Sequence, residues 1–125
     1  MDIVLFDREL DLMEVLWERG PATVADVRAS LADDLAHNTV LTLLRRMEQK
    51  GYVRREDDGR GHRYFPLIER GQARGGALRR LLDRAFGGSP ELLLTQLLDE
   101  KKLNEPQIRR LREILNAKHP RGDQP

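Results

Sequence analysis

Apolar residues recur at helical spacing between residues 36 and 50, and this segment ends at Gly51. The apolar positions follow the pattern i, i+3, i+4 and i+7 and form one inward stripe, made of Val40, Leu43, Leu44 and Met47. The opposite face carries Asn38, Leu41, Thr42, Arg45 and Gln49. Such side chains can read base edges, because Asn and Gln pair with adenine, Arg pairs with guanine, and Leu or Thr contacts the thymine methyl group. An ordinary solvated helix face has the same pattern, so both interpretations stay open.

A basic β-hairpin is predicted directly after this helix, with strands at 52–56 and 62–65 and a glycine-containing turn at 57–61. Two strands alone are marginally stable, so the hairpin must pack on the helices, for which it offers Tyr52, Val53, Tyr64 and Phe65. Its arginines are left outward or at the tip, where they can reach phosphates or a minor groove: Arg54, Arg55, Arg60 and Arg63. Basic residues on an edge hairpin also prevent aggregation, but the basic helix just before it favours DNA binding.

Two further helices are predicted before residue 36. The first covers residues 8–18, with Asp7 as N-cap, Gly20 beyond its end, and an inward stripe of Leu10, Met13, Leu16 and Trp17. The second begins after Thr23, which has Asp26 at capping-box spacing, and turns Val24, Val27 and Leu31 inward. A linker of only four residues, 32–35, then holds the second and third helices at a fixed angle, which indicates a helix-turn-helix.

After Pro66 the chain becomes leucine-rich and helical, with helices predicted at 69–85, from Pro90 after the N-cap Ser89, and from Asn104, which has Gln107 at capping-box spacing. About 50 residues cannot cover so many leucines, which predicts a partner, most economically a second copy of the chain. The leucines could instead pack back onto the N-terminal domain. The predicted dimerisation residues are Leu92, Leu93, Leu97, Leu98, Ile108, Leu111, Ile114 and Leu115.

The predicted fold class is therefore mainly α with a small β-hairpin (α+β). A winged helix-turn-helix domain occupies residues 1–68, a helical dimerisation domain occupies 69–118, and 119–125 form a flexible tail. The net charge is only +1, but it is unevenly distributed: residues 1–35 hold nine acids and three arginines, whereas 36–65 hold seven Lys or Arg and four acids. Phosphate binding depends on the local potential, so such a chain can still bind a duplex, with an affinity that falls as salt rises.

Several function classes are excluded or disfavoured by the composition. The chain has no cysteine, which excludes disulfides, thiolate metal sites and cysteine catalysis, and its three histidines lack ligand spacing, so no metal or other cofactor is expected. We find no nucleophile–base pairing, phosphate-binding loop or carboxylate pair, so no catalytic residue is assigned and the protein is not expected to be an enzyme. Without a membrane-spanning apolar run or a basic signal-peptide start, the chain is expected to be cytoplasmic.

Three segments together resemble one known family: ELDLMEVLWERGPATVADVRASL, HNTVLTLLRRMEQKGYVRRE and GRGHRYFPLI. They are similar to the BlaI/MecI penicillinase-repressor family of bacterial transcriptional repressors, which includes the copper-responsive CopY proteins. The resemblance continues through GGSPELLLTQLL and LNEPQIRRLREIL. It implies a sequence-specific repressor that binds a palindromic operator on double-stranded DNA as a homodimer.

The resemblance also suggests residue roles. Thr39, Thr42 and Arg46 match the recognition-helix pattern, with Arg46 assigned to phosphate, while Asn38, Leu41 and Arg45 stand where members vary and would set the operator sequence. The full predicted DNA-binding set is Asn38, Thr39, Leu41, Thr42, Arg45, Arg46, Arg60, His62 and Arg63.

Two departures from the family leave the inducing signal open. Members cut by a membrane sensor-protease carry an Asn–Phe bond where this chain has Gln96–Leu97, so a regulatory protease stays an open partner, and the C-terminal cysteine metal site of the CopY-like members is missing. The alternative function is a winged-helix adaptor that binds proteins and not DNA, since fold alone does not decide function.

Overall fold

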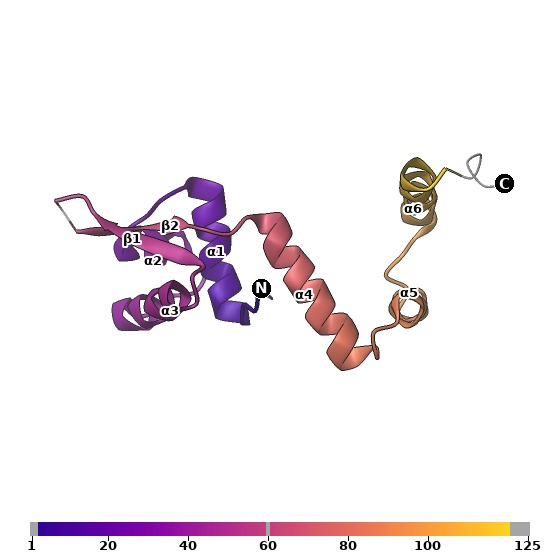
Figure 1. The fold of residues 1–125 in the computed structure, drawn as a ribbon, viewed down its shortest axis with the longest axis horizontal. Coiled ribbons are helices and arrows are strands. Elements are labelled where there is room, and N and C mark those ends of the chain that lie inside the picture. The colour runs from indigo at the N-terminus through magenta and orange to yellow at the C-terminus, as the bar shows by residue number, and fades with distance from the viewer. Residues whose placement is uncertain (1–2, 60, 121–125) are drawn as a thin grey trace. The chain divides into compact units, whose positions relative to one another are not determined.

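The computed structural model describes residues 3–59 and 61–120, which form six helices and one two-stranded antiparallel sheet. Figure 1 shows their order along the chain: α1 (Asp7–Arg19), α2 (Val24–Ser30), α3 (His37–Gln49), β1 (Val53–Asp57), β2 (His62–Pro66), α4 (Arg70–Ala85), α5 (Pro90–Asp99) and α6 (Glu105–Lys118). The chain folds into two compact units, residues 1–80 and 81–125. The prediction of a flexible tail at 119–125 concerns mainly residues 121–125, which lie outside the described part of the chain.

α1 differs from the predicted first helix at its start and in its inward face. The N-cap is Phe6 and not Asp7, because the side chain of Glu9 folds back to accept the Phe6 backbone N–H at 2.9 Å. Leu10 is exposed, so its assignment to the inward stripe was wrong. The buried residues are instead spaced i, i+3, i+4 and i+7, and they are Glu9, Leu12, Met13 and Leu16. An acid at the first inward position hid this stripe in the sequence, because Glu is rarely buried.

α2 has the predicted capping box. The Thr23 hydroxyl accepts the Asp26 backbone N–H at 3.1 Å, and the Asp26 carboxylate accepts the Thr23 backbone N–H at 3.2 Å. These hydrogen bonds to Thr23 lower the pKa of Asp26 below its ordinary value. The cap therefore stabilises the helix above the ordinary Asp pKa and is lost as pH falls through the lowered one. The connection from α2 to α3 covers residues 31–36, slightly longer than the four residues expected.

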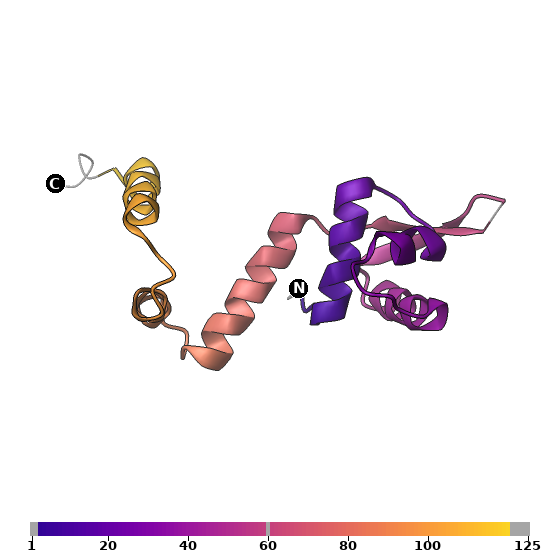
Figure 2. The same ribbon diagram turned by 180° about the vertical axis from the view of Figure 1, so that it is seen from behind.

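The three N-terminal helices and the hairpin share one core of buried side chains. Figure 2 shows from behind how these helices gather beside the hairpin. Val27 of α2 and Val40, Leu44 and Met47 of α3 are fully buried, and Leu43 packs at the edge of the core. The hairpin adds Tyr52, Val53 and Tyr64, which are also buried. The strands pair with Val53 opposite Pro66 and Asp57 opposite His62, close to the predicted bounds. Tyr64 also exchanges backbone hydrogen bonds of 3.2 and 2.8 Å with Ala22, which ties the hairpin to the chain between α1 and α2.

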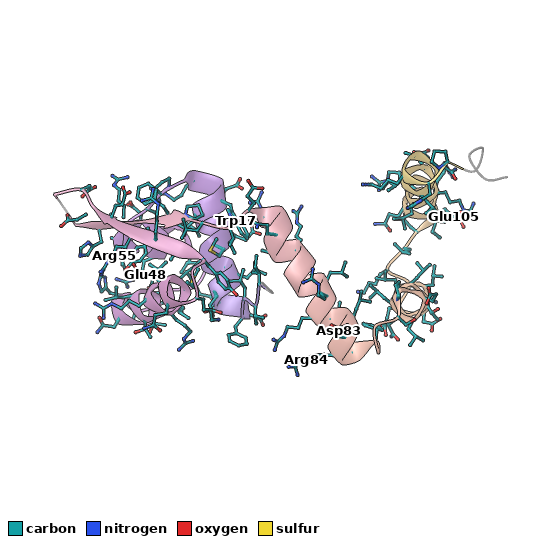
Figure 3. The ribbon with its side chains drawn as sticks, viewed as in Figure 1. Trp17, Glu48, Arg55, Asp83, Arg84 and Glu105 are labelled. Atoms are coloured by element: carbon teal, nitrogen blue, oxygen red, sulfur yellow. The ribbon has the colours of Figure 1, made fainter. Side chains whose placement is uncertain are left out.

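The first turns of α4 are part of the N-terminal unit. Ala73 is buried in its core, and at Gly76 the helix approaches the N-terminal segment so closely that a Cβ atom would lie 2.3 Å from the Ile3 carbonyl oxygen. The Trp17 indole N–H, labelled in Figure 3, donates to the Ile68 carbonyl at 2.9 Å just before α4 begins. Arg70 adds ion pairs to Glu14 and Glu18 on α1.

The second unit contains two well-capped helices with little burial. Ser89 caps α5 and Asn104 caps α6 with Gln107 completing its box, all as predicted. Neither helix has a buried residue. The eight residues predicted to form a dimer interface are all exposed or half-buried within the chain: Leu92, Leu93, Leu97, Leu98, Ile108, Leu111, Ile114 and Leu115.

Candidate nucleic-acid interface

α3 presents an uncovered polar face. Asn38, Thr39, Thr42, Arg45, Arg46 and Gln49 are all exposed, and Leu41 is half-buried. The side chains of Val40, Leu44 and Met47 on the other side of the same helix are fully buried, so the helix is held by one face and offers the other. An α-helix is about 10–12 Å wide with its side chains, which fits the major groove of about 12 Å. The face can therefore enter a duplex without any rearrangement of the core.

A buried ion pair fixes the C-terminal end of α3. The Lys50 ammonium lies 2.9 and 3.0 Å from the two carboxylate oxygens of Glu9 and 4.6 Å from the centre of the Phe6 ring. The Glu9 side chain is only 1% exposed, while that of Lys50 is 26% exposed. This pair joins the start of α1 to the end of α3. Sequence reasoning missed it, and the available signal was the acid at the first position of the α1 inward stripe.

Gly51 lets the chain turn from α3 into the hairpin. Its φ of +84° lies in the left-handed region, which favours glycine. The predicted end of the helix at Gly51 is therefore confirmed.

The arginines of the hairpin are exposed, but each described one has an acidic partner. Arg54 pairs with Glu56 and stacks 4.2 Å from the centre of the Phe65 ring, and Arg63 pairs with Asp58 at 2.7 Å. Arg55 lies 3.9 Å from Glu48, so this pair, labelled in Figure 3, links the hairpin to α3. The hairpin is thus less basic than its arginine content suggested.

His62, another predicted DNA contact, is exposed opposite Asp57. The predicted contact Arg60 lies outside the described residues.

Arg45 and Arg46 on α3 differ from the hairpin arginines, because neither makes an ion pair with any residue that the structure describes. The opposite charge gathers elsewhere in this unit, around a groove of about 510 Å³ beside α1 and the end of α2, where Asp11, Glu14, Glu18 and Asp33 are found. A hydrogen bond and ion pair with Asp33 raise the pKa of Arg8 in this groove. Two free cations therefore lie on α3, where a polyanion would be attracted, and a group of acids lies beside α1.

We also searched residues 3–59 and 61–120 for a metal site and for a membrane-spanning helix. No group of three or more His, Asp or Glu residues there is arranged to hold a metal ion. No helix in this part of the chain has the length and apolar character needed to cross a bilayer.

Comparison with known proteins finds similarity to transcriptional regulators. The penicillinase repressor family pattern matches residues 5–117. "Transcriptional regulator BlaI" of Mycobacterium tuberculosis is 34% identical over 97% of this chain and 90% of that protein. "Methicillin resistance regulatory protein MecI" of Staphylococcus aureus is 23% identical over 88% of this chain and 91% of that protein.

One solved structure shows a relative on DNA. It is the solution structure of monomeric Bacillus licheniformis BlaI in complex with the blaP half-operator, which has 26% sequence identity and a TM-score of 0.50. The likeness covers 58% of this chain and 90% of that one.

Proposed function

The chain belongs to the penicillinase repressor family, a family of transcriptional repressors, and on that premise we propose that it represses transcription by binding a palindromic operator as a homodimer. The observation that carries DNA binding is the exposed face of α3, with two unpaired arginines opposite a fully buried apolar stripe. Asn38, Leu41 and Arg45 would read bases, while Arg46 would contact the phosphate backbone. Because the proposed target is chromosomal DNA, the proposed location is the cytoplasm.

The homodimer is proposed because the second unit leaves its leucines uncovered. Large apolar side chains such as Leu92, Leu98, Leu111, Ile114 and Leu115 are 44–61% exposed along α5 and α6. Exposed apolar side chains in this number indicate an interface, and two-fold pairing of identical chains is the commonest solution. Two reading helices set about 34 Å apart, or a multiple of it, would then require a palindromic site.

The proposal is tested by selecting duplexes from a random library with the wild-type protein and titrating the best duplex at two salt concentrations. A DNA-binding repressor is expected to enrich a two-fold sequence, with an affinity that falls steeply between 50 and 200 mM salt. The alternative adaptor would enrich no sequence and bind weakly at both concentrations. That result would overturn the proposed function.

Replacing Arg45 by alanine is expected to weaken binding to the selected duplex by about 1–3 kcal/mol and to relax preference at one base pair. The physical reason is the loss of a bidentate contact to guanine, which phosphate contacts elsewhere do not replace. Fluorescence anisotropy with the selected duplex and with single-base variants measures both effects. Arg74→Ala, an exposed arginine on α4, is the matched control. An equal loss on every sequence would make Arg45 a phosphate contact.

The bond at the position where some family members are cut lies within a helix of this chain. The Gln96–Leu97 bond, at the place where other members are cut, lies inside α5, and the Gln96 carbonyl accepts the Glu100 backbone N–H at 2.9 Å. Proteolysis concentrates in exposed loops and termini, so a regulatory protease would have to unwind α5 before cutting there.

A further inference from the structure

A groove of about 570 Å³ lies beside the reading helix, within residues 1–80. Arg46 of α3 and Arg80 of α4 line it, together with Leu43 and Phe6. The Arg80 guanidinium lies 5.7 Å from the centre of the Phe6 ring. Stacking on an aromatic ring holds a guanidinium in place and leaves its N–H groups free to donate.

The two arginines carry the unpaired positive charges of this groove. Neither Arg46 nor Arg80 forms an ion pair with a residue in the described parts of the chain. Of the other charged residues lining the groove, Glu9 is paired with Lys50, and Arg8 is paired with Asp33 and Asp11. Asp7 is exposed at the start of α1 and is the remaining acid. The groove therefore keeps a positive charge that a phosphodiester can neutralise.

The position of the groove follows from the geometry of α3. Arg46 lies seven residues after Thr39, on the same flank of the helix and next to the exposed reading face. An α-helix nearly fills the major groove. The phosphates of one DNA strand therefore lie along one flank of the helix, and those of the other strand lie along the other flank. A DNA strand bound by Arg46 would then pass close to Arg80, which lines the same groove.

We propose that Arg46 and Arg80 hold neighbouring phosphates of one DNA strand, so that α4 is part of the DNA-binding surface. The inference rests on the proposed function, because it takes the phosphodiester backbone of a duplex as the partner. Arg80 lies on the α4 face that carries Ala73 and Gly76, seven and four residues earlier, and this face packs on the N-terminal unit. A phosphate contact at Arg80 would therefore hold α4 on the duplex. α4 is the helix that leads into residues 81–125.

The test compares the salt dependence of Arg80→Ala with that of wild type and Arg74→Ala on a 30-base-pair duplex of mixed sequence. Each phosphate contact contributes a slope of about −0.9 to the logarithm of affinity against the logarithm of salt concentration. Arg80→Ala is expected to reduce the slope by about 0.9, which is a factor of about 3.5 over a fourfold change in salt. Arg74→Ala, on another face of α4, should keep the wild-type slope. Arg80→Gln, which keeps a side chain near Phe6, should reproduce the reduced slope.

An unchanged slope in both Arg80 variants would overturn the inference while leaving DNA binding intact. The same conclusion would follow if Arg74→Ala reduced the slope as much as Arg80→Ala, because the effect would then reflect general charge. Failure of the wild-type protein to bind any duplex would instead overturn the proposed function. Thermal unfolding of each variant checks that the fold is kept, as expected for exposed arginines.

Discussion

Replacing Lys50 by methionine is expected to lower the free energy of unfolding by about 3 kcal/mol. The substitution leaves the Glu9 carboxylate buried without its cation, and breaking a buried pair from one side costs about 3–5 kcal/mol. The lower end applies because the Lys50 side chain retains 26% exposure. Urea denaturation followed by circular dichroism measures the loss. Because the pair joins the start of α1 to the end of α3, we also expect weaker operator binding near the unfolding midpoint.

Two controls separate this effect from the loss of any surface charge. Arg19→Met breaks the Arg19–Asp26 pair, whose side chains are 42% and 37% exposed, and should cost no more than about 1 kcal/mol. Adding Glu9→Gln to Lys50→Met removes the orphaned charge and keeps an acceptor for the Phe6 N–H, so much of the stability should return. A Lys50→Met variant as stable as Arg19→Met would contradict the assignment of Glu9 and Lys50 as a buried, stabilising ion pair.

Replacing Leu98 by aspartate is expected to produce monomers and to weaken binding to a two-fold operator by about 100- to 10,000-fold. Leu98 is 48% exposed within the chain, so the charge should leave the monomer folded while making the apolar surface unfit for a dimer interface. Each monomer would still hold one half-site, but the second contact would no longer be linked to the first. Sedimentation velocity reports the oligomeric state, and titration of full-site and half-site duplexes reports the loss.

Thr95→Asp is the matched control, because it adds one negative charge to an exposed position of the same helix on the side that carries Glu91 and Asp99, away from the leucines. It should stay dimeric and bind the full site as wild type does. The half-site affinity of Leu98→Asp should also match that of wild type, since the α3 face is unchanged. A Leu98→Asp protein that stayed dimeric would place the interface on another surface.

Much of the fold could be predicted because its signals are local. Helix caps at Thr23, Ser89 and Asn104 satisfy nearby backbone N–H groups, so a few neighbouring residues are enough to reveal them. The α3 stripe and the hairpin were predicted for a similar reason, because spacing alone separates inward from outward positions. The α1 stripe was misassigned because the burial of Glu9 depends on Lys50, 41 residues later.

The candidate interface also has features that the sequence predicts and features that only the folded structure shows. The outward positions of α3 follow from periodicity, and the structure leaves those positions exposed. Periodicity did not show that Arg54, Arg55 and Arg63 are paired with acids, nor that Arg80 lies across a groove from Arg46. Those facts decide which arginines are available to a phosphate.

The sequence by itself determined the family, through motifs spread along the chain. It also determined the order of the helices and hairpin and the outward face of α3, since these depend on residues within a few turns of one another. Tertiary structure alone decided that the Glu9–Lys50 pair holds the end of α3 and that the first turns of α4 pack on the N-terminal helices. Ion pairing and close packing act between side chains far apart in the chain. Such side chains come close to one another only when the chain folds, so local sequence patterns do not reveal these contacts.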